Sequence, residues 1–174
     1  MHLRFVSPDK MNINGDMLFP ALFIDSSDVG RCALKMQFCI YRVACTNGLI
    51  VPAVNMMYHQ RHIGLESEEF ELGLASSLEH IPSFIGEAEA MVNYATSKKV
   101  RLLTAEDVAF VLKEIRHYAR LSEDDAMAVL ALREEKGYDA TRWGIVNAIT
   151  DFAHSKTLDV REDLERAAGM MLAA

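Results

Sequence analysis

The sequence of 174 residues has little of what marks several protein classes. It holds three cysteines, nine glycines and four prolines. An odd number of cysteines argues against a disulfide framework, and the low glycine and proline content excludes collagen-like and low-complexity chains. No apolar run approaches the roughly 18 residues that cross a bilayer, and residues 1–4 do not open a signal peptide. We therefore expect a cytoplasmic protein without a membrane partner.

Motifs of the common enzyme and DNA-binding classes are also missing. The sequence has no GxGxxG, GxxxxGK[ST], HExxH or GxSxG pattern, and no helix-turn-helix with a basic second helix is recognisable. These absences disfavour an ordinary ATPase, dehydrogenase, zinc protease or repressor. We therefore expect no cofactor.

The composition indicates one globular domain with an uneven charge. Hydrophobic residues make up 51% of the chain, which is enough for a core, and the net charge is −7. Residues 1–64 carry six Lys or Arg and four Asp, for a net +2, so the remainder carries −9. An anionic ligand should therefore prefer the first part of the chain, whereas most later carboxylates are expected on solvated helix faces.

Residues 1–64 are expected to be mainly strands. Short apolar runs at 3–6 and 17–24 are bounded by turn-forming residues, and residues 34–40 alternate between apolar and polar side chains. This period of two is typical of a half-buried strand, because successive side chains point to opposite faces of a sheet.

The alternation changes phase after Ile40. The strand is therefore expected either to bulge close to Arg42 or to be covered on both faces. Asn47 and Gly48 together form a strong signal for a hairpin turn, which favours strands over a helical interpretation of this region.

Residues 65–174 are expected to be mainly helical. Apolar residues recur there at helical spacing, Pro82 interrupts the first helical stretch, and Gly137 is placed to end the fourth. Three hydroxyl residues are expected to cap helix N-termini: Ser67, Thr104 and Ser122. Two further helices are expected over residues 141–155 and 159–172. The predicted fold is a single α+β domain over residues 1–174, with an antiparallel sheet from the N-terminal third packed by five or six helices on one face.

Signals for metal binding and nucleophilic catalysis are weak. His59 and His62 could reach one metal from a helical turn, but the cysteine spacings match no zinc motif, so we predict no metal site and reduced core thiols. Cys45 is the one candidate nucleophile. Asp151 and His154 are one helical turn apart and are candidates for an acid/base pair in a small-molecule hydrolase.

The helix predicted over residues 141–155 carries a polar face with one large aromatic. Trp143 and Asn147 are four residues apart on this face. One interpretation makes Trp143 a core aromatic and Asn147 a partner of a backbone group. The other makes the indole a stacking platform for a planar ligand whose polar edge Arg142 or Asn147 holds.

Two blocks of the sequence resemble a known family. Residues 41–51 (YRVACTNGLIV) are similar to an R-x-x-C-T-N-G-L signature, and residues 141–154 (TRWGIVNAITDFAH) are similar to a later T-x-W-x-x-x-N-A-[IV]-T block. Both belong, in this order, to the phage/plasmid-like proteins classed as domain of unknown function 932. The resemblance implies a phage, prophage or plasmid setting in a bacterial host. It singles out the matching residues Arg42, Cys45, Thr46, Asn47, Gly48, Trp143, Asn147 and Thr150.

These observations lead to a hypothesis and two alternatives. The first is a non-enzymatic accessory protein that engages single-stranded nucleic acid or a host nucleoprotein complex through a cation-lined hollow. The second is an anti-defence inhibitor that mimics nucleic acid with the carboxylates of residues 66–90 and 106–125; the third is the hydrolase. Self-association through the C-terminal helix is also possible, on an apolar side formed by Leu164, Ala168, Met171 and Leu172. The predicted ligand-binding residues are Arg42, Thr46, Asn47, Gly48, His59, Arg61, His62, Arg142, Trp143 and Asn147.

Overall fold

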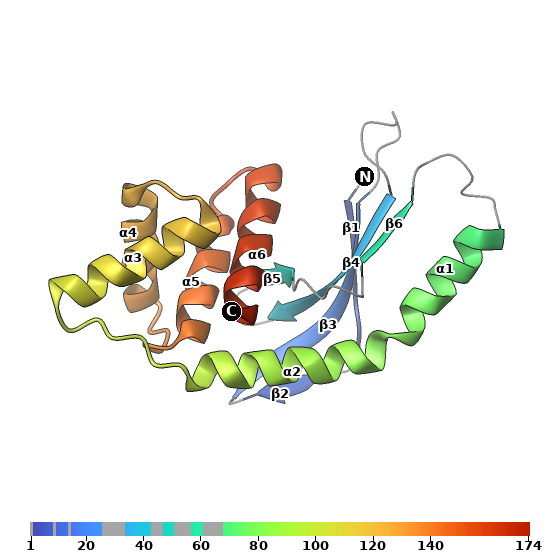
Figure 1. The fold of residues 1–174 in the computed structure, drawn as a ribbon, viewed down its shortest axis with the longest axis horizontal. Helices are drawn as coiled ribbons and strands as arrows, with labels where there is room; N and C mark the ends of the chain where they lie inside the picture. Colours follow the sequence, from blue (N-terminus) through green and yellow to red (C-terminus); the bar gives the residue numbers. More distant parts are fainter. Residues whose placement is uncertain are drawn as a thin grey trace.

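A computed structural model describes residues 2–8, 10–13, 15–25, 34–42, 47–50, 57–60 and 68–174. The chain is α+β, as predicted: strands occupy its first third and helices follow (Figure 1). The strands are β1 His2–Val6, β2 Met11–Ile13, β3 Asp16–Asp25, β4 Leu34–Arg42, β5 Asn47–Ile50 and β6 Met57–Gln60. The helices are α1 Glu68–Glu79, α2 Ile81–Ser97, α3 Ala105–Ala119, α4 Glu123–Glu135, α5 Arg142–Ala153 and α6 Leu158–Ala173.

Two long antiparallel strands form the centre of the sheet. β3 and β4 pair continuously, from Leu18 opposite Arg42 to Asp25 opposite Lys35. The outer edge of each is shared by two short strands: β1 and β2 pair with successive parts of β3, and β5 and β6 with successive parts of β4. All these pairings are antiparallel, as the sequence analysis predicted.

The phase change in β4 comes from cover on both faces. Phe38, Cys39 and Ile40 are all buried, although neighbouring side chains point to opposite sides of the sheet. The ladder to β3 runs through this stretch without an extra residue, so β4 has no bulge within its described length. Of the two explanations that the sequence left open, the structure selects burial on both faces.

The predicted turn at Asn47-Gly48 is wrong. Both residues belong to β5, where Asn47 pairs with Arg42 and Gly48 pairs with Tyr41. The connection between β4 and β5 therefore falls on residues 43–46, which lie outside the described residues. An Asn-Gly pair favours a tight turn through its local backbone preference. Here the hydrogen bonds between β5 and the long strand β4 outweigh that preference, so both residues are extended.

The predicted helix boundaries are confirmed where the structure describes them. Thr104 accepts a hydrogen bond from the Asp107 amide, and the Asp107 carboxylate accepts one from the Thr104 amide, which completes a capping box. Ser122 caps α4, and Gly137 follows that helix with a φ of 67°. Pro82 lies in the first turn of α2, where its missing N–H costs no helical bond. Ser67 lies outside the described residues.

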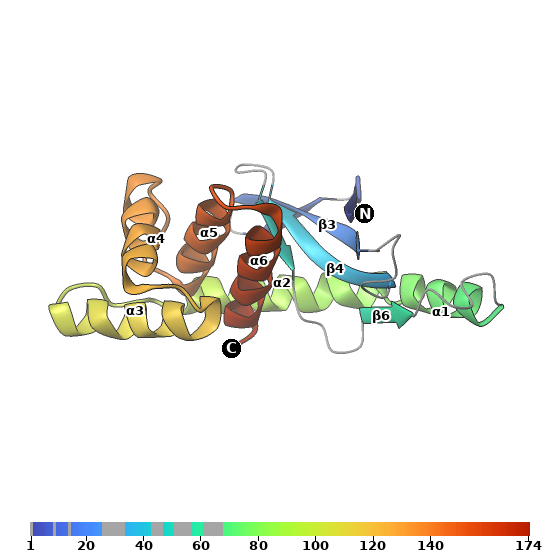
Figure 2. The same cartoon turned by 90° about the horizontal axis from the view of Figure 1, so that it is seen from above.

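The main core lies between one face of the sheet and the helices. Phe38 of β4 packs on Phe84 of α2, with ring centroids 5.2 Å apart. α2 runs along the sheet, while α5 and α6 stand beside β5 and separate it from α3 and α4 (Figures 1 and 2). A smaller cluster of Ala21, Phe23 and Cys39 lies on the opposite face.

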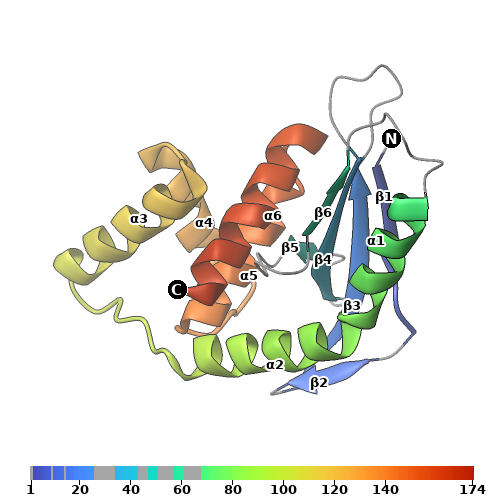
Figure 3. The ribbon, with the colours of Figure 1, turned by 45° about the vertical axis from the view of Figure 1, so that its right-hand side comes forward.

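The last helix is largely interior. α6 packs between α5, α3 and β5, as Figure 3 illustrates from a second direction. The apolar residues that the sequence offered for self-association, Leu164, Ala168, Met171 and Leu172, are all buried in the core. The apolar side chains that α6 leaves exposed are Leu158, Val160 and Met170. No described helix is long and apolar enough to cross a membrane.

Gly144, in the first turn of α5, provides a test of this packing. A Cβ at this position would lie 1.9 Å from the carbonyl oxygen of Asp139. The substitution Gly144→Ala should therefore lower the free energy of unfolding by about 3 kcal/mol or more, measured by urea denaturation.

Gly86 in α2 is the matched control, because a Cβ there would meet no atom within 4 Å. Gly86→Ala should stabilise the protein by up to about 1 kcal/mol, since alanine is the better helix former. Equal effects of the two substitutions would contradict the packing described for Gly144.

Candidate functional site

Asp16 joins two of the predicted site residues. Its carboxylate accepts hydrogen bonds from Nε and Nη2 of Arg42 and, through the other oxygen, from the indole N–H of Trp143 at 2.7 Å. Arg42 and Trp143 thus meet around a partly buried carboxylate, and the cation-lined hollow that the first hypothesis placed at Arg42 does not form there. The carboxylate that brings them together was missed, because Asp16 lies 26 residues from Arg42 and 127 from Trp143.

The strand geometry aims these groups at the helices. Asp16 and Leu18 are two residues apart on β3, and Arg42 pairs with Leu18, so all three share the face that packs on the helical core. The guanidinium of Arg42 also lies over the ring of Tyr138, 5.4 Å from its centroid. The Tyr138 hydroxyl donates to Asp151 at 3.3 Å.

This network is largely closed to solvent. The side chain of Arg42 is 14% exposed, and Trp143 is 7% exposed. Asn147 is buried and donates to the carbonyl of Trp143, and the buried Thr150 hydroxyl donates to the carbonyl of Asn147. In this arrangement the indole packs in the core, and its N–H and the Asn147 amide have partners inside the protein.

The other predicted residues are placed as follows. Asp151 accepts from Tyr138, and Nε2 of His154 lies 3.3 Å from Nη2 of Arg161. His59 lies on strand β6 and not on the helical turn that a metal pair with His62 would use. Cys45, Thr46, Arg61 and His62 lie outside the described residues, and only the strand placement of Asn47 and Gly48 is described. Within the described chain, no group of three potential metal ligands is positioned to hold an ion.

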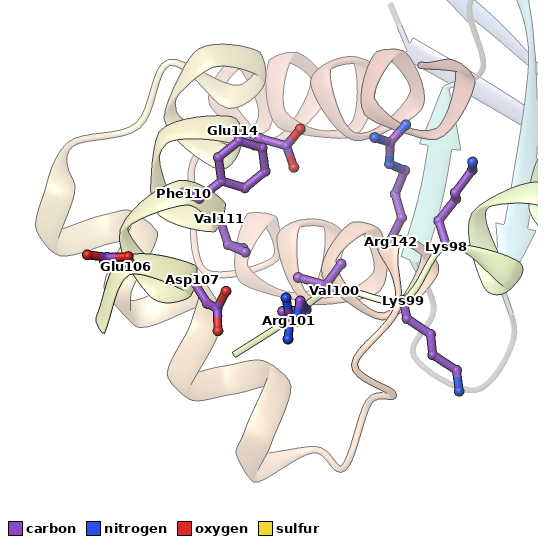
Figure 4. Close-up of a pocket in the computed structure, with 10 residues that line it drawn as sticks. All are labelled: Lys98, Lys99, Val100, Arg101, Glu106, Asp107, Phe110, Val111, Glu114 and Arg142. Atoms are coloured by element: carbon purple, nitrogen blue, oxygen red, sulfur yellow. The ribbon is translucent and has the colours of Figure 1, made fainter. Parts of the chain in front are cut away.

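A second predicted residue, Arg142, lines a cleft of about 470 Å³ on the outside of the helical part (Figure 4). One wall is basic and comes from the segment between α2 and α3 together with the start of α5. Its cations are Lys98, Lys99, Arg101 and Arg142. None of the four takes part in an ion pair within the described residues.

Backbone pairing holds this basic wall in place. The Arg142 amide donates to the carbonyl of Lys98, the Val100 amide donates to the carbonyl of Ala140, and Lys99 forms a β-bridge with Thr141. The cations therefore come from two fixed segments that lie side by side. Nη1 of Arg142 is covered from solvent and meets no hydrogen-bond partner among the described residues, so it is a buried donor behind the cleft wall and not part of its open surface.

The opposite wall comes from α3 and has a different chemistry. It carries Phe110, whose side chain is 62% exposed, with Glu106, Asp107 and Glu114. Asp107 is committed to the helix cap. Desolvation raises the pKa of its carboxyl. Hydrogen bonds from Thr104 and Leu103 and the charge of Arg101 outweigh desolvation, so this pKa lies below its usual value. This cleft was not predicted from the sequence, although the three cations within residues 98–101 are a signal for a basic surface.

Comparison with known proteins assigns the family. A family model described as a domain of unknown function, DUF932, matches residues 2–170. The chain belongs to the DUF932 family. The resemblance seen in the two sequence blocks is thereby confirmed over nearly the whole chain. No curated protein and no solved structure matches the chain significantly.

The Asp16 network can be tested by substitution. Asp16→Asn keeps the shape but removes the charge that Arg42 and the indole N–H need, so we expect a loss of about 2–4 kcal/mol in unfolding free energy. Trp143→Phe removes one hydrogen bond to a charged group and should cost about 2 kcal/mol. Urea denaturation of the single and double variants measures both effects.

The double variant distinguishes a shared network from two unrelated sites. Both substitutions act on the same Asp16–Trp143 contact. The loss of unfolding free energy in the double variant should therefore be smaller than the sum of the losses in the two single variants. Additivity within about 0.5 kcal/mol would contradict the network.

Proposed function

We propose that this protein is a non-enzymatic accessory protein of a phage, prophage or plasmid and that it binds single-stranded nucleic acid. The observation that carries the proposal is the cleft between the 98–101 segment and α3. Four cations that form no ion pair within the described residues line one wall, and an exposed aromatic ring lines the other beside three carboxylates. Arg101 lies close enough to Asp107 to lower the pKa of that carboxyl, and Lys98 lies over the Tyr94 ring. Phosphates and base faces are the two groups that single strands offer to such a surface.

We place the binding surface at the cleft lined by Arg142, and not at Arg42 as the sequence-based hypothesis had it. Arg42 and Trp143 are mutually engaged through Asp16, and binding a ligand there would have to displace that carboxylate. Arg142, the residue before Trp143, instead lines an open cleft beside Lys98 and Lys99. Single strands suit the site better than duplex, since a base must be unstacked to lie against Phe110.

The net charge of −7 limits the strength of binding. A mostly acidic surface repels nucleic acid at a distance, so affinity should depend on a few local phosphate contacts. We expect binding that is measurable at low salt and weak at moderate salt. The salt dependence should correspond to about two or three phosphates, a small slope for a nucleic-acid-binding protein.

Fluorescence anisotropy with a labelled single-stranded oligothymidine, at two salt concentrations, tests this function. Replacing both Lys98 and Arg142 by Ala should weaken binding at least about tenfold and reduce the salt dependence by roughly one to two phosphate contacts. Both substitutions remove side chains that line the cleft.

The matched control is the pair Lys113→Ala and Lys136→Ala. Both lysines are exposed, neither lines the cleft, and their loss changes the net charge equally. The control variant should bind nearly as well as the wild type. Equal weakening in the two double variants, or no binding by the wild type at low salt, would contradict the proposal.

A second candidate function rests on the exposed carboxylates of the outer helices. Glu123 and Asp124 begin α4, and Figure 1 shows this helix on the side of the molecule away from the sheet. Glu123 also forms an ion pair with Arg116 at 3.3 Å. An exposed acidic helix end of this kind can contact the basic channel of a host nucleoprotein complex. Salt-sensitive capture of a host protein that Glu123→Lys with Asp124→Lys abolishes would support this function over the first.

A further inference from the structure

The α3 wall of the cleft carries the carboxylate of Glu114, which does not help to bind a phosphate. Glu114 follows Phe110 by four residues, which places both side chains on the same face of the helix. Figure 4 shows them on one side of the cleft, with Arg142 and Lys98 on the other. A site that only attracted phosphate would be weakened by this negative charge, so the carboxylate calls for a different partner.

Glu114 is available to bind a ligand. No hydrogen bond or ion pair engages its side chain within the described part of the chain, and it is only partly covered. An ionised carboxylate accepts hydrogen bonds and donates none. The ligand group that it faces must therefore present N–H or O–H donors.

The nucleobases differ in this property. Adenine, cytosine and guanine carry exocyclic amino groups, whereas thymine presents carbonyl oxygens on either side of a single ring N–H. Guanine offers two adjacent N–H donors, which match the two oxygens of a carboxylate. A base stacked on Phe110 would bring its edge toward the residue one helical turn away, which is Glu114.

The size of the cleft sets the length of strand that enters it. About 470 Å³ lies within the range of pockets that hold one small molecule, and it matches a single nucleotide better than a run of several. With the phosphate on the basic wall, the base of that nucleotide lies on the α3 wall. Neighbouring nucleotides would then remain outside.

We propose that the cleft takes one nucleotide of a single strand and selects a base that carries an amino group, guanine most strongly, through Glu114. This inference rests on the proposed function and deepens it. In this arrangement Arg142 and Lys98 hold the phosphate, Phe110 stacks on the base, and Glu114 accepts hydrogen bonds from its edge.

The test compares labelled thymidine octamers that differ at one central position. Thymine, guanine or hypoxanthine occupies that position, and hypoxanthine is guanine without its amino group. The guanine octamer should bind about tenfold more tightly than the all-thymine octamer, with hypoxanthine between them. Glu114→Gln should remove most of this preference, because the amide offers one acceptor in place of two charged ones, while binding of the all-thymine octamer should be unchanged or tighter.

Glu89→Gln, on α2 and outside the cleft lining, is the charge-matched control and should retain the guanine preference. Equal affinity for all three octamers, or a preference that survives Glu114→Gln, would overturn the inference but leave the proposed function standing. Failure of every octamer to bind would overturn the proposed function itself. The thermal unfolding midpoint of Glu114→Gln, expected to match the wild type, shows that a changed preference does not come from misfolding.

Discussion

One carboxylate joins the two parts of this protein. Asp16, at the start of β3, holds both Arg42 of the neighbouring strand and the indole of Trp143 in α5. Sheet and helices otherwise meet mainly through apolar contacts, which fix distance but leave register loosely defined. A charge-assisted pair that also engages an indole N–H has a definite direction, and it couples the orientation of α5 to the ladder between β3 and β4. The family-like blocks around residues 41–51 and 141–154 thereby share one interaction in the folded chain.

The sequence predicted best those features that depend on near neighbours. The caps at Thr104 and Ser122 and the break at Pro82 require only residues within one turn, and the structure has all three. Alternation predicted β4, and its change of phase was correctly linked to burial on both faces as one of two outcomes. The antiparallel sheet and the following helices were predicted as a fold class.

Features that depend on distant partners were not predicted. Asn47-Gly48 favours a turn by itself, but the pairing of β5 with Arg42 and Tyr41 overrides that local preference. Asp16 was not among the predicted site residues, because nothing near it in sequence reveals that it accepts hydrogen bonds from Arg42 and Trp143. The short strand β2 carries too few residues for a recognisable alternation of apolar and polar side chains.

An accessible hollow at Arg42 was predicted, and the contact is closed because Asp16, distant in sequence from both donors, holds Arg42 and Trp143 together. The basic cleft was not predicted, since its two walls, which carry Arg142 and Phe110, come together only in the tertiary structure.

The first turn of α5 carries consecutive residues with opposite surroundings. Trp143 is anchored inside by Asp16, Arg142 lines the outer cleft, and Gly144 lets the backbone of Asp139 pass close by. This turn can hardly rotate, because any movement that shifts Arg142 would also pull the indole from its partner. The backbone at Arg142 is therefore fixed by contacts that lie in the interior and between the two paired segments. The buried contacts of Trp143 and Gly144 thus also fix the position of the backbone that forms one wall of the outer cleft.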